Sequence, residues 1–135
     1  MNFSDFNLDA RLLHNVHKMG YETPTPIQDA ALPAGLAGKD ILGSAETGTG
    51  KTAAYLLPIL QRFLNSTDRP RNARALILVP TRELALQVVD HAEQLSKGSP
   101  VRVVAIYGGV SLINQEQQLR RGVDIIIATP GRLLD

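Results

Sequence analysis

The stretch from residue 45 to residue 52 constrains the fold of this chain most, because it joins two glycines to a lysine and a threonine. Its residues are Ala45, Glu46, Thr47, Gly48, Thr49, Gly50, Lys51 and Thr52. A short apolar run at 41–42 precedes it, and a helical pattern of apolar residues follows from Ala53. A strand, a glycine-rich turn, Gly-Lys-Thr and a helix are the arrangement of a phosphate-binding loop.

Each residue type in this stretch suits the binding of a nucleotide. Gly48 and Gly50 let successive backbone N–H groups turn toward one anion, and the start of the next helix adds its positive dipole end. Lys51 can reach the β- and γ-phosphates, and Thr52 offers a hydroxyl to the accompanying Mg²⁺. Ala45 stands where the strict pattern has glycine, so an ordinary glycine-rich turn is the alternative. The predicted strand and helix on either side favour the phosphate site.

Length and composition indicate one globular domain. The 135 residues are 44% hydrophobic and contain no cysteine, which excludes disulfides and thiolate metal sites. No apolar run reaches membrane-spanning length, and residues 1–5 show no signal-peptide pattern, so we expect a cytoplasmic protein.

The charge balance does not by itself indicate a nucleic-acid partner. Fourteen basic and 13 acidic residues give a net charge of +1, and aromatic residues make up only 4%. Strong nucleic-acid binders usually carry a basic excess, and base-stacking platforms need aromatic rings. Any role with RNA must therefore be inferred from specific motifs.

The remaining pattern alternates helices and strands. We predict helices at about 8–19, from Pro26 to the region of Pro33, 51–64, 81–97, 111–121 and from 129 onward, and strands at 41–42, 75–79, 101–107 and 124–128. Thr25, Pro26 and Gln28 form a capping box, which gives Gln28 a structural interpretation, and Pro33 should keep that helix short. The continuous apolar run at 75–79 predicts a strand covered on both faces. Such alternation predicts an α/β fold with a parallel sheet and helices on both faces.

Three more loops follow predicted strands and should meet the phosphate loop at one edge of the sheet. Their residues are Pro80, Thr81, Arg82, Glu83; Gly108, Gly109; and Thr129, Pro130, Gly131, Arg132.

These loops, together with the Pro-Thr-Pro-Ile-Gln run at 24–28, closely resemble the first RecA-like domain of the DEAD-box RNA helicases. The resemblance covers essentially the whole chain, in order, and the runs at 80–85 and 129–132 are very specific to that family. The family also accepts alanine at position 45. The resemblance implies an ATP-dependent RNA helicase, with ATP and Mg²⁺ as cofactors and an RNA partner bound with little sequence specificity.

The resemblance also implies a role for each matching residue. Residues 1–38 correspond to the Q-motif region and residues 39–135 to the P-loop and the RNA-contact motifs Ia, GG and Ib. Gln28 would hold the adenine edge, Tyr21 would pack against the base and Phe3 would support this site. Lys51 and Thr52 are the candidate catalytic residues. The loops at 80–83, 108–109 and 129–132 would contact the RNA backbone through amides, hydroxyls and arginines.

The family's Asp-Glu-Ala-Asp box, Ser-Ala-Thr motif and second RecA-like domain have no counterpart in these 135 residues. An arginine finger alone contributes about 10³–10⁵ in rate. We therefore expect the 135-residue chain to be an incomplete RecA-like domain that does not hydrolyse ATP by itself. Because a sheet that lacks some of its strands exposes strand edges, we also expect marginal stability or self-association of the chain.

Two other functions stay open at this point. One is a non-catalytic adenine-nucleotide-binding module that switches a partner. The other is a small-molecule kinase or another P-loop NTPase, which leaves the loops at 80–85 and 129–132 unexplained. Loss of adenine selectivity on Gln28→Ala would favour the helicase interpretation.

Overall fold

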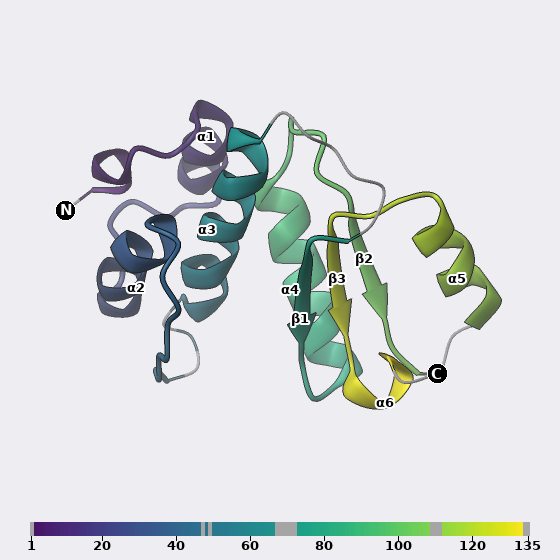
Figure 1. The fold of residues 1–135 in the computed structure, drawn as a ribbon. Helices are drawn as coiled ribbons and strands as arrows, with labels where there is room; N and C mark the ends of the chain where they lie inside the picture. The colour runs from purple at the N-terminus through teal and green to yellow at the C-terminus, as the bar shows by residue number, and fades with distance from the viewer. Residues whose placement is uncertain (1, 47, 49, 67–72, 109–111, 134–135) are drawn as a thin grey trace. The chain divides into compact units, whose positions relative to one another are not determined.

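A computed structural model describes residues 2–46, 48, 50–66, 73–108 and 112–133 of the chain (Figure 1). The chain divides into two compact units. The N-terminal unit comprises residues 1–67 and 94–99, and the C-terminal unit comprises residues 68–93 and 100–135. Each unit is described by itself.

The N-terminal unit is helical. It contains a short 3-10 helix, η1 (Phe3–Phe6), and the helices α1 (Ala10–Lys18), α2 (Pro26–Leu36) and α3 (Lys51–Asn65). In α1 the Asp9 side chain accepts a hydrogen bond from the Arg11 N–H, and the helix buries Leu12 and Val16 completely. The buried Asn15 amide donates to the carbonyls of Leu95 (2.7 Å) and Lys97 (2.8 Å). These bonds fasten residues 94–99 to this unit.

The start of α2 confirms the predicted capping box, but the predicted early end at Pro33 is wrong. Thr25 and Gln28 exchange the two cap hydrogen bonds, and the helix continues through Pro33 to Leu36. Pro33 lies on an exposed face, and the carbonyl of Pro33 accepts the Ala37 N–H at 3.1 Å. The last turn packs closely on α3, since a Cβ added at Gly35 would lie 2.7 Å from Pro58 Cγ. Pro33 itself has no N–H to donate, so the helix passes through this position with one hydrogen bond fewer.

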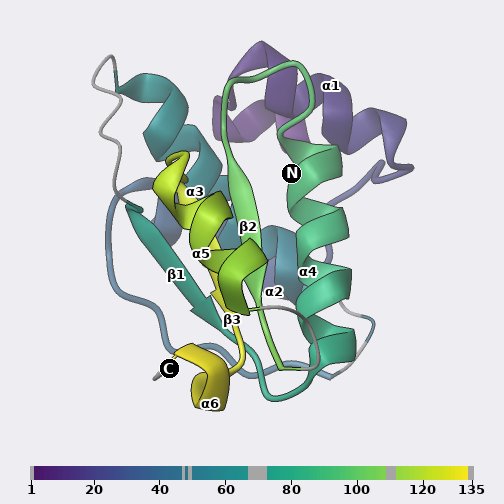
Figure 2. The ribbon, with the colours of Figure 1, turned by 90° about the vertical axis from the view of Figure 1, so that its right-hand side faces the viewer.

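The C-terminal unit is an α/β sandwich around a parallel sheet. Its elements are β1 (Ala75–Leu78), most of α4 (Arg82–Leu95), β2 (Val103–Ile106), α5 (Leu112–Arg120), β3 (Ile125–Ala128) and α6 (Pro130–Leu133). The strand order is β1-β3-β2, with both pairs parallel. Helix α4 lies on one face of the sheet and α5 on the other (Figures 1 and 2). The predicted fold class, a parallel sheet with helices on both faces, is confirmed.

The predicted strand at 41–42 does not form. Among the described residues the sheet has three strands rather than four, and residues 39–46 adopt neither helix nor strand. Ile41 is 47% exposed and Leu42 is fully exposed. A strand needs a hydrogen-bonded neighbour, and the described strands pair only among themselves.

The prediction that 75–79 is covered on both faces is also wrong. Leu76 and Leu78 are 52% and 54% exposed, in alternation with half-buried neighbours. Among the described strands β1 pairs only with β3, and α5 contacts β2 instead. The central strand β3 is covered better than β1, because Ile125 and Ile127 are completely buried.

A buried carboxylate joins the amino ends of all three strands. Asp124 precedes β3, is fully buried, and forms ion pairs with Arg74 (3.1 Å), just before β1, and Arg102 (3.2 Å), just before β2. It also accepts the Arg102 backbone N–H at 2.8 Å. Burial acts to raise the pKa of Asp124, but the hydrogen bonds from Arg102 and Arg74 outweigh it and lower the pKa. The opposite, carboxyl edge of the sheet carries the described residues of the three loops at 80–83, 108–109 and 129–132.

Candidate nucleotide and nucleic-acid sites

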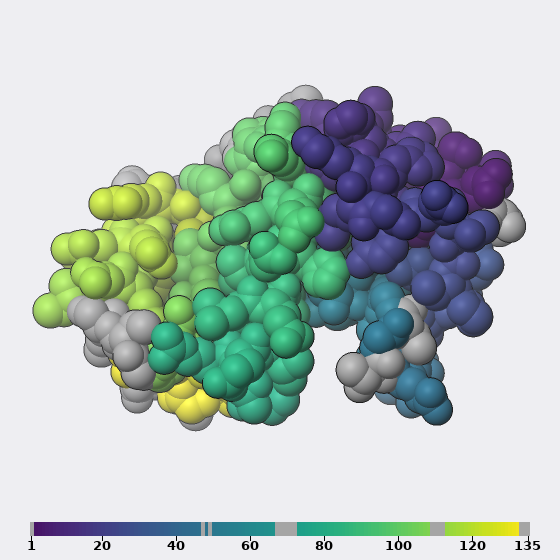
Figure 3. Space-filling view, turned by 180° about the vertical axis from the view of Figure 1, so that it is seen from behind, coloured from purple at the N-terminus to yellow at the C-terminus, as the bar shows by residue number. Residues whose placement is uncertain are grey.

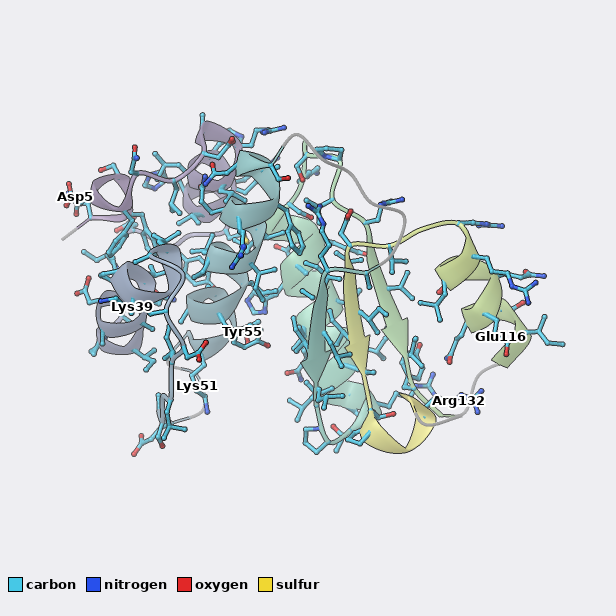
Figure 4. All side chains as sticks on the ribbon, in the orientation of Figure 1. Asp5, Lys39, Lys51, Tyr55, Glu116 and Arg132 are labelled. Atoms are coloured by element: carbon cyan, nitrogen blue, oxygen red, sulfur yellow. The ribbon has the colours of Figure 1, made fainter. Side chains whose placement is uncertain are left out.

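The phosphate loop ends where α3 begins. Gly48 and Gly50 have φ values of 83° and 82°, in the left-handed region that favours glycine. Gly50 caps α3, Lys51 is its exposed first residue and Thr52 is half-buried. Figure 4 shows Lys51 at that end of the helix, and in Figure 3 residues 41–46 project from the body of the N-terminal unit. Thr47 and Thr49 lie outside the described residues.

Gln28 connects the start of α2 to the phosphate loop. Its Oε1 accepts the Thr25 N–H at 3.0 Å, and its Nε2 donates to the Gly50 carbonyl at 3.1 Å. The side chain is fully buried, and a Cβ added at Gly50 would overlap the Gln28 carboxamide. A carboxamide has further hydrogen-bonding capacity beyond these two bonds. In this conformation, however, Gln28 is a structural link that a base cannot reach.

The two aromatic residues predicted for the adenine site lie together. The ring centroids of Phe3 and Tyr21 are 6.3 Å apart, and Phe6 lies edge-on to Phe3 at the same separation. Phe3 is completely buried, so it can act on a ligand only by supporting Tyr21. Tyr21 is partly exposed, and burial raises the pKa of its phenol.

Tyr55 is a neighbour of the phosphate loop that the sequence analysis missed. It lies one turn after Thr52 on α3 and shares a side-chain hydrogen bond with it. Burial raises the pKa of Tyr55, and this hydrogen bond acts in the opposite direction. The spacing of three residues on a helix is the signal that could have revealed the pair.

Hard oxygen ligands suit Mg²⁺, and the Thr52 hydroxyl is one of them. Within the described part of the chain there is no group of three or more His, Cys, Asp or Glu residues that could hold a metal ion.

A second candidate site lies at the carboxyl ends of the three strands, whose arrangement Figure 2 shows. It is a hollow of 540 Å³, which we call the strand-end hollow. Its lining residues are Pro80, Arg82, Gly108, Thr129, Pro130, Gly131 and Arg132. The fold thus brings together residues of all three predicted RNA-contact loops. Gly109 lies outside the described residues.

Thr81 and Glu83 do not line the hollow. The Thr81 hydroxyl accepts the Leu84 N–H at 3.2 Å and caps α4, as the sequence predicted. Glu83 is exposed in the first turn of that helix, where an acidic side chain complements the helix dipole. Both residues therefore have a structural interpretation that needs no ligand.

Two residues beside the hollow escaped the sequence analysis. The Arg82 guanidinium lies 5.1 Å from the centre of the Tyr107 ring, within cation–π range. The Gln115 amide hydrogen-bonds to the Tyr107 carbonyl and to the Arg132 side chain. In the sequence Gln115 is one of three glutamines in a polar helix, and nothing there distinguishes the buried one.

A larger hollow of 660 Å³ lies along β2, between α4 and α5. Val103, Val104 and Ala105 of β2 line its floor. No residue of the three predicted RNA-contact loops or of the phosphate loop lines it.

The comparisons with known proteins define the class. Residues 25–135 match the DEAD/DEAH box helicase family. This chain therefore belongs to that family, and the resemblance stated from the sequence is confirmed.

Individual relatives agree with this assignment. The chain is 46% identical to the ATP-dependent RNA helicase CshA of Listeria monocytogenes, across 98% of this chain and 25% of CshA. It is 51% identical to the ATP-dependent RNA helicase SrmB of Escherichia coli, across 98% of this chain and 30% of SrmB. The chain thus spans less than a third of these two relatives.

Solved structures share the fold. The RNA helicase Prp28 of Chaetomium thermophilum bound to ADP superposes with a TM-score of 0.90 at 46% identity, covering 99% of this chain and 33% of that one. A DEAD box protein from Methanococcus jannaschii superposes with a TM-score of 0.91 at 37% identity, covering 100% of this chain and 36% of that one.

In the described residues no helix has the length and hydrophobicity needed to cross a bilayer.

Proposed function

We propose that this chain supplies the ATP-binding and RNA-binding part of a DEAD-box ATP-dependent RNA helicase, which in the whole protein couples ATP hydrolysis to unwinding or remodelling of RNA. The observation that carries this proposal is the convergence of Arg82, Gly108, Thr129 and Arg132 on one strand-end hollow. Two guanidinium groups beside backbone amides can bind the phosphates of a nucleic-acid backbone, and such contacts carry no sequence specificity. Prp28, a relative in fold, is an RNA helicase that binds ADP.

The two halves of this function belong to different residues. Within the region 1–38, Gln28 and Tyr21 would contact adenine, with Phe3 behind them. Within the region 39–135, the phosphate loop at 45–52 would hold the phosphates, and the three loops of motifs Ia, GG and Ib would hold RNA. Lys51 would neutralise charge on the β- and γ-phosphates, and Thr52 would bind Mg²⁺. A cytoplasmic location also stays a prediction.

The Gln28 side chain must become accessible before it can contact a base. It is fully buried and bonded to Thr25 and Gly50. We infer that adenine binding opens a path to the carboxamide while the bond to the Gly50 carbonyl keeps the phosphate loop in register. The same bond would let adenine binding influence the loop.

We infer that these 135 residues bind nucleotide without hydrolysing it. Phosphoryl transfer depends on a group that orients the attacking water and on an arginine finger, and none of the proposed site residues fills either role. RNA-stimulated phosphate release from the purified chain, with Lys51→Ala as the blank, would contradict this. Binding without turnover would leave a nucleotide-binding module as the activity of these residues alone.

The direct test of the nucleotide half is a titration with fluorescent ADP and GDP. We expect saturable binding that prefers ADP and a loss of that preference in Gln28→Ala. Gln118→Ala, an exposed glutamine on α5, is the matched control and should bind as the unchanged chain does. Equal affinity for ADP and GDP would favour another class of P-loop NTPase.

Self-association of the chain also stays a proposal. The edge strand β1 exposes Leu76 and Leu78, and exposed apolar edges invite pairing with a second chain. Light scattering during size exclusion should show a mass that rises with concentration. A monomer at every concentration would contradict the proposal.

A further inference from the structure

One buried amide joins two of the loops that form the strand-end hollow. Gln115, on α5, is 5% exposed. Its Nε2 donates to the Tyr107 carbonyl at 2.9 Å, and its Oε1 accepts from Arg132 Nε at 3.3 Å. Tyr107 directly precedes Gly108, which lines the hollow. Arg132, on α6, lines the hollow itself.

The chemistry of the partners fixes the orientation of the amide. A backbone carbonyl can only accept, and a guanidinium Nε–H can only donate. The amide must therefore present its nitrogen to Tyr107 and its oxygen to Arg132. A glutamine satisfies both at once, whereas a hydrocarbon or a carboxylate of similar length cannot.

Tyr107 extends the connection to the third loop. Its ring lies beneath the Arg82 guanidinium, at 5.1 Å. Arg82 and Arg132 are the two cationic side chains that line the hollow. Gln115 thus bonds to the Arg132 side chain directly. It also bonds to the backbone of Tyr107, whose ring lies against Arg82.

We propose that Gln115 is a positioning residue for RNA binding, which sets the Arg132 guanidinium and the Tyr107–Gly108 backbone for contact with consecutive phosphates. This rests on the proposed function, since it assumes that the strand-end hollow binds RNA. A long arginine side chain loses rotamer freedom on binding, and a hydrogen bond made in advance reduces that cost. Gln115 itself touches no phosphate.

The test measures binding of a labelled single-stranded oligouridine to the 135-residue chain at several salt concentrations. Gln115→Met keeps the buried volume and removes both hydrogen bonds. We expect it to weaken RNA binding about tenfold. The slope of log affinity against log salt should fall by about 0.7, the value of one phosphate contact on a single strand. ADP affinity should not change, and Gln117→Met, exposed on the same helix, should bind RNA normally.

A double-mutant cycle separates positioning from a general loss of structure. Gln115→Met should have a clearly smaller effect once Arg132→Ala is present, because one of the two groups that it positions is gone and only the Tyr107–Gly108 backbone remains. Independent, multiplying effects would overturn the proposal, as would normal binding by Gln115→Met when Arg132→Ala binds weakly. If Arg132→Ala itself binds normally, the proposed RNA site fails and the inference fails with it.

A second variant covers the case in which Gln115→Met does not fold. Arg132→Lys keeps the positive charge but lacks the planar Nε–H that Gln115 accepts. We expect RNA binding several-fold weaker than in the unchanged chain, although the charge is the same. Unchanged affinity would show that charge alone suffices and would overturn the proposal.

Discussion

The phosphate loop of the N-terminal unit and the strand-end hollow of the C-terminal unit are supported in opposite ways. The loop follows a segment without helix or strand, in which Leu42 is fully exposed. The hollow lies on the ends of three hydrogen-bonded strands. The residues of the phosphate loop are consecutive in the sequence, so a local motif specifies them. The residues that line the hollow come from three separate loops and meet only when the strands pair.

The supports differ in kind as well. Two glycines with positive φ and the Gln28 amide shape the loop. The hollow depends on the Asp124 ion pairs at the far ends of the strands and on the Gln115 amide beside it. The loop should therefore be sensitive to backbone conformation, and the hollow to the removal of buried polar partners.

The largest effect should come from Asp124→Asn. It leaves two arginines near a buried neutral amide, and breaking a buried ion pair costs about 3–5 kcal/mol. Denaturant unfolding should show this loss in the C-terminal unit. Asp9→Asn is the control, because its ion pair with Arg11 is partly exposed and asparagine also caps a helix well. A loss no larger than that of Asp9→Asn would show that the strand ends need no carboxylate.

The same carboxylate predicts a pH dependence of stability. The folded-state pKa of Asp124 is lowered, so its contribution is present above the unfolded-state value of about 3.9 and is lost as the pH falls through the lower folded-state pKa. Asp124→Asn should abolish that part of the acid dependence. Parallel pH–stability curves for both chains would contradict the assignment.

The second largest effect should distinguish two glycines of the loop. Gly48 and Gly50 have nearly equal φ values, so alanine should strain each backbone by roughly 1–2 kcal/mol. At Gly48 the new Cβ would meet no described atom within 4 Å, but at Gly50 it would meet the Gln28 amide. We expect Gly50→Ala to cost about 1–3 kcal/mol more than Gly48→Ala in thermal unfolding. The excess should shrink in a Gln28→Ala background, and an unchanged excess would remove Gln28 as its cause.

The smallest effect should come from the cap of α4. Thr81→Ala removes the hydroxyl that accepts the Leu84 N–H and should cost about 1 kcal/mol. Thr81→Ser keeps the hydroxyl and should be nearly neutral. A larger loss of RNA affinity than of stability in Thr81→Ala would indicate that this hydroxyl also contacts RNA.

Local signals predicted the helices and the loops better than the sheet. The capping box at Thr25 and Gln28 and the strand-ending loops follow from short-range patterns. The apolar pair Ile41–Leu42 looked like a strand because periodicity cannot reveal whether a partner strand is present. The exposure of Leu76 and Leu78 was missed for the same reason, since coverage is a tertiary property.

The candidate sites show the same division. The residue types of the phosphate loop were readable from the sequence, but the closure of Gln28 onto Gly50 was not. Arg82 and Arg132 were predicted from their loops. Tyr107 and Gln115, which contact them, belong to a strand end and a polar helix that carry no motif.

The central claim is that the phosphate loop binds nucleotide and the strand-end hollow binds RNA. Its most direct test measures the affinities of Lys51→Ala and of Arg132→Ala for fluorescent ADP and for labelled oligouridine. We predict that Lys51→Ala weakens ADP binding by about tenfold or more and leaves RNA binding unchanged, because it removes a charge-assisted contact to phosphate. Arg132→Ala should do the reverse. If either substitution weakened both ligands equally without unfolding the chain, the assignment of nucleotide to the phosphate loop and RNA to the strand-end hollow would be wrong.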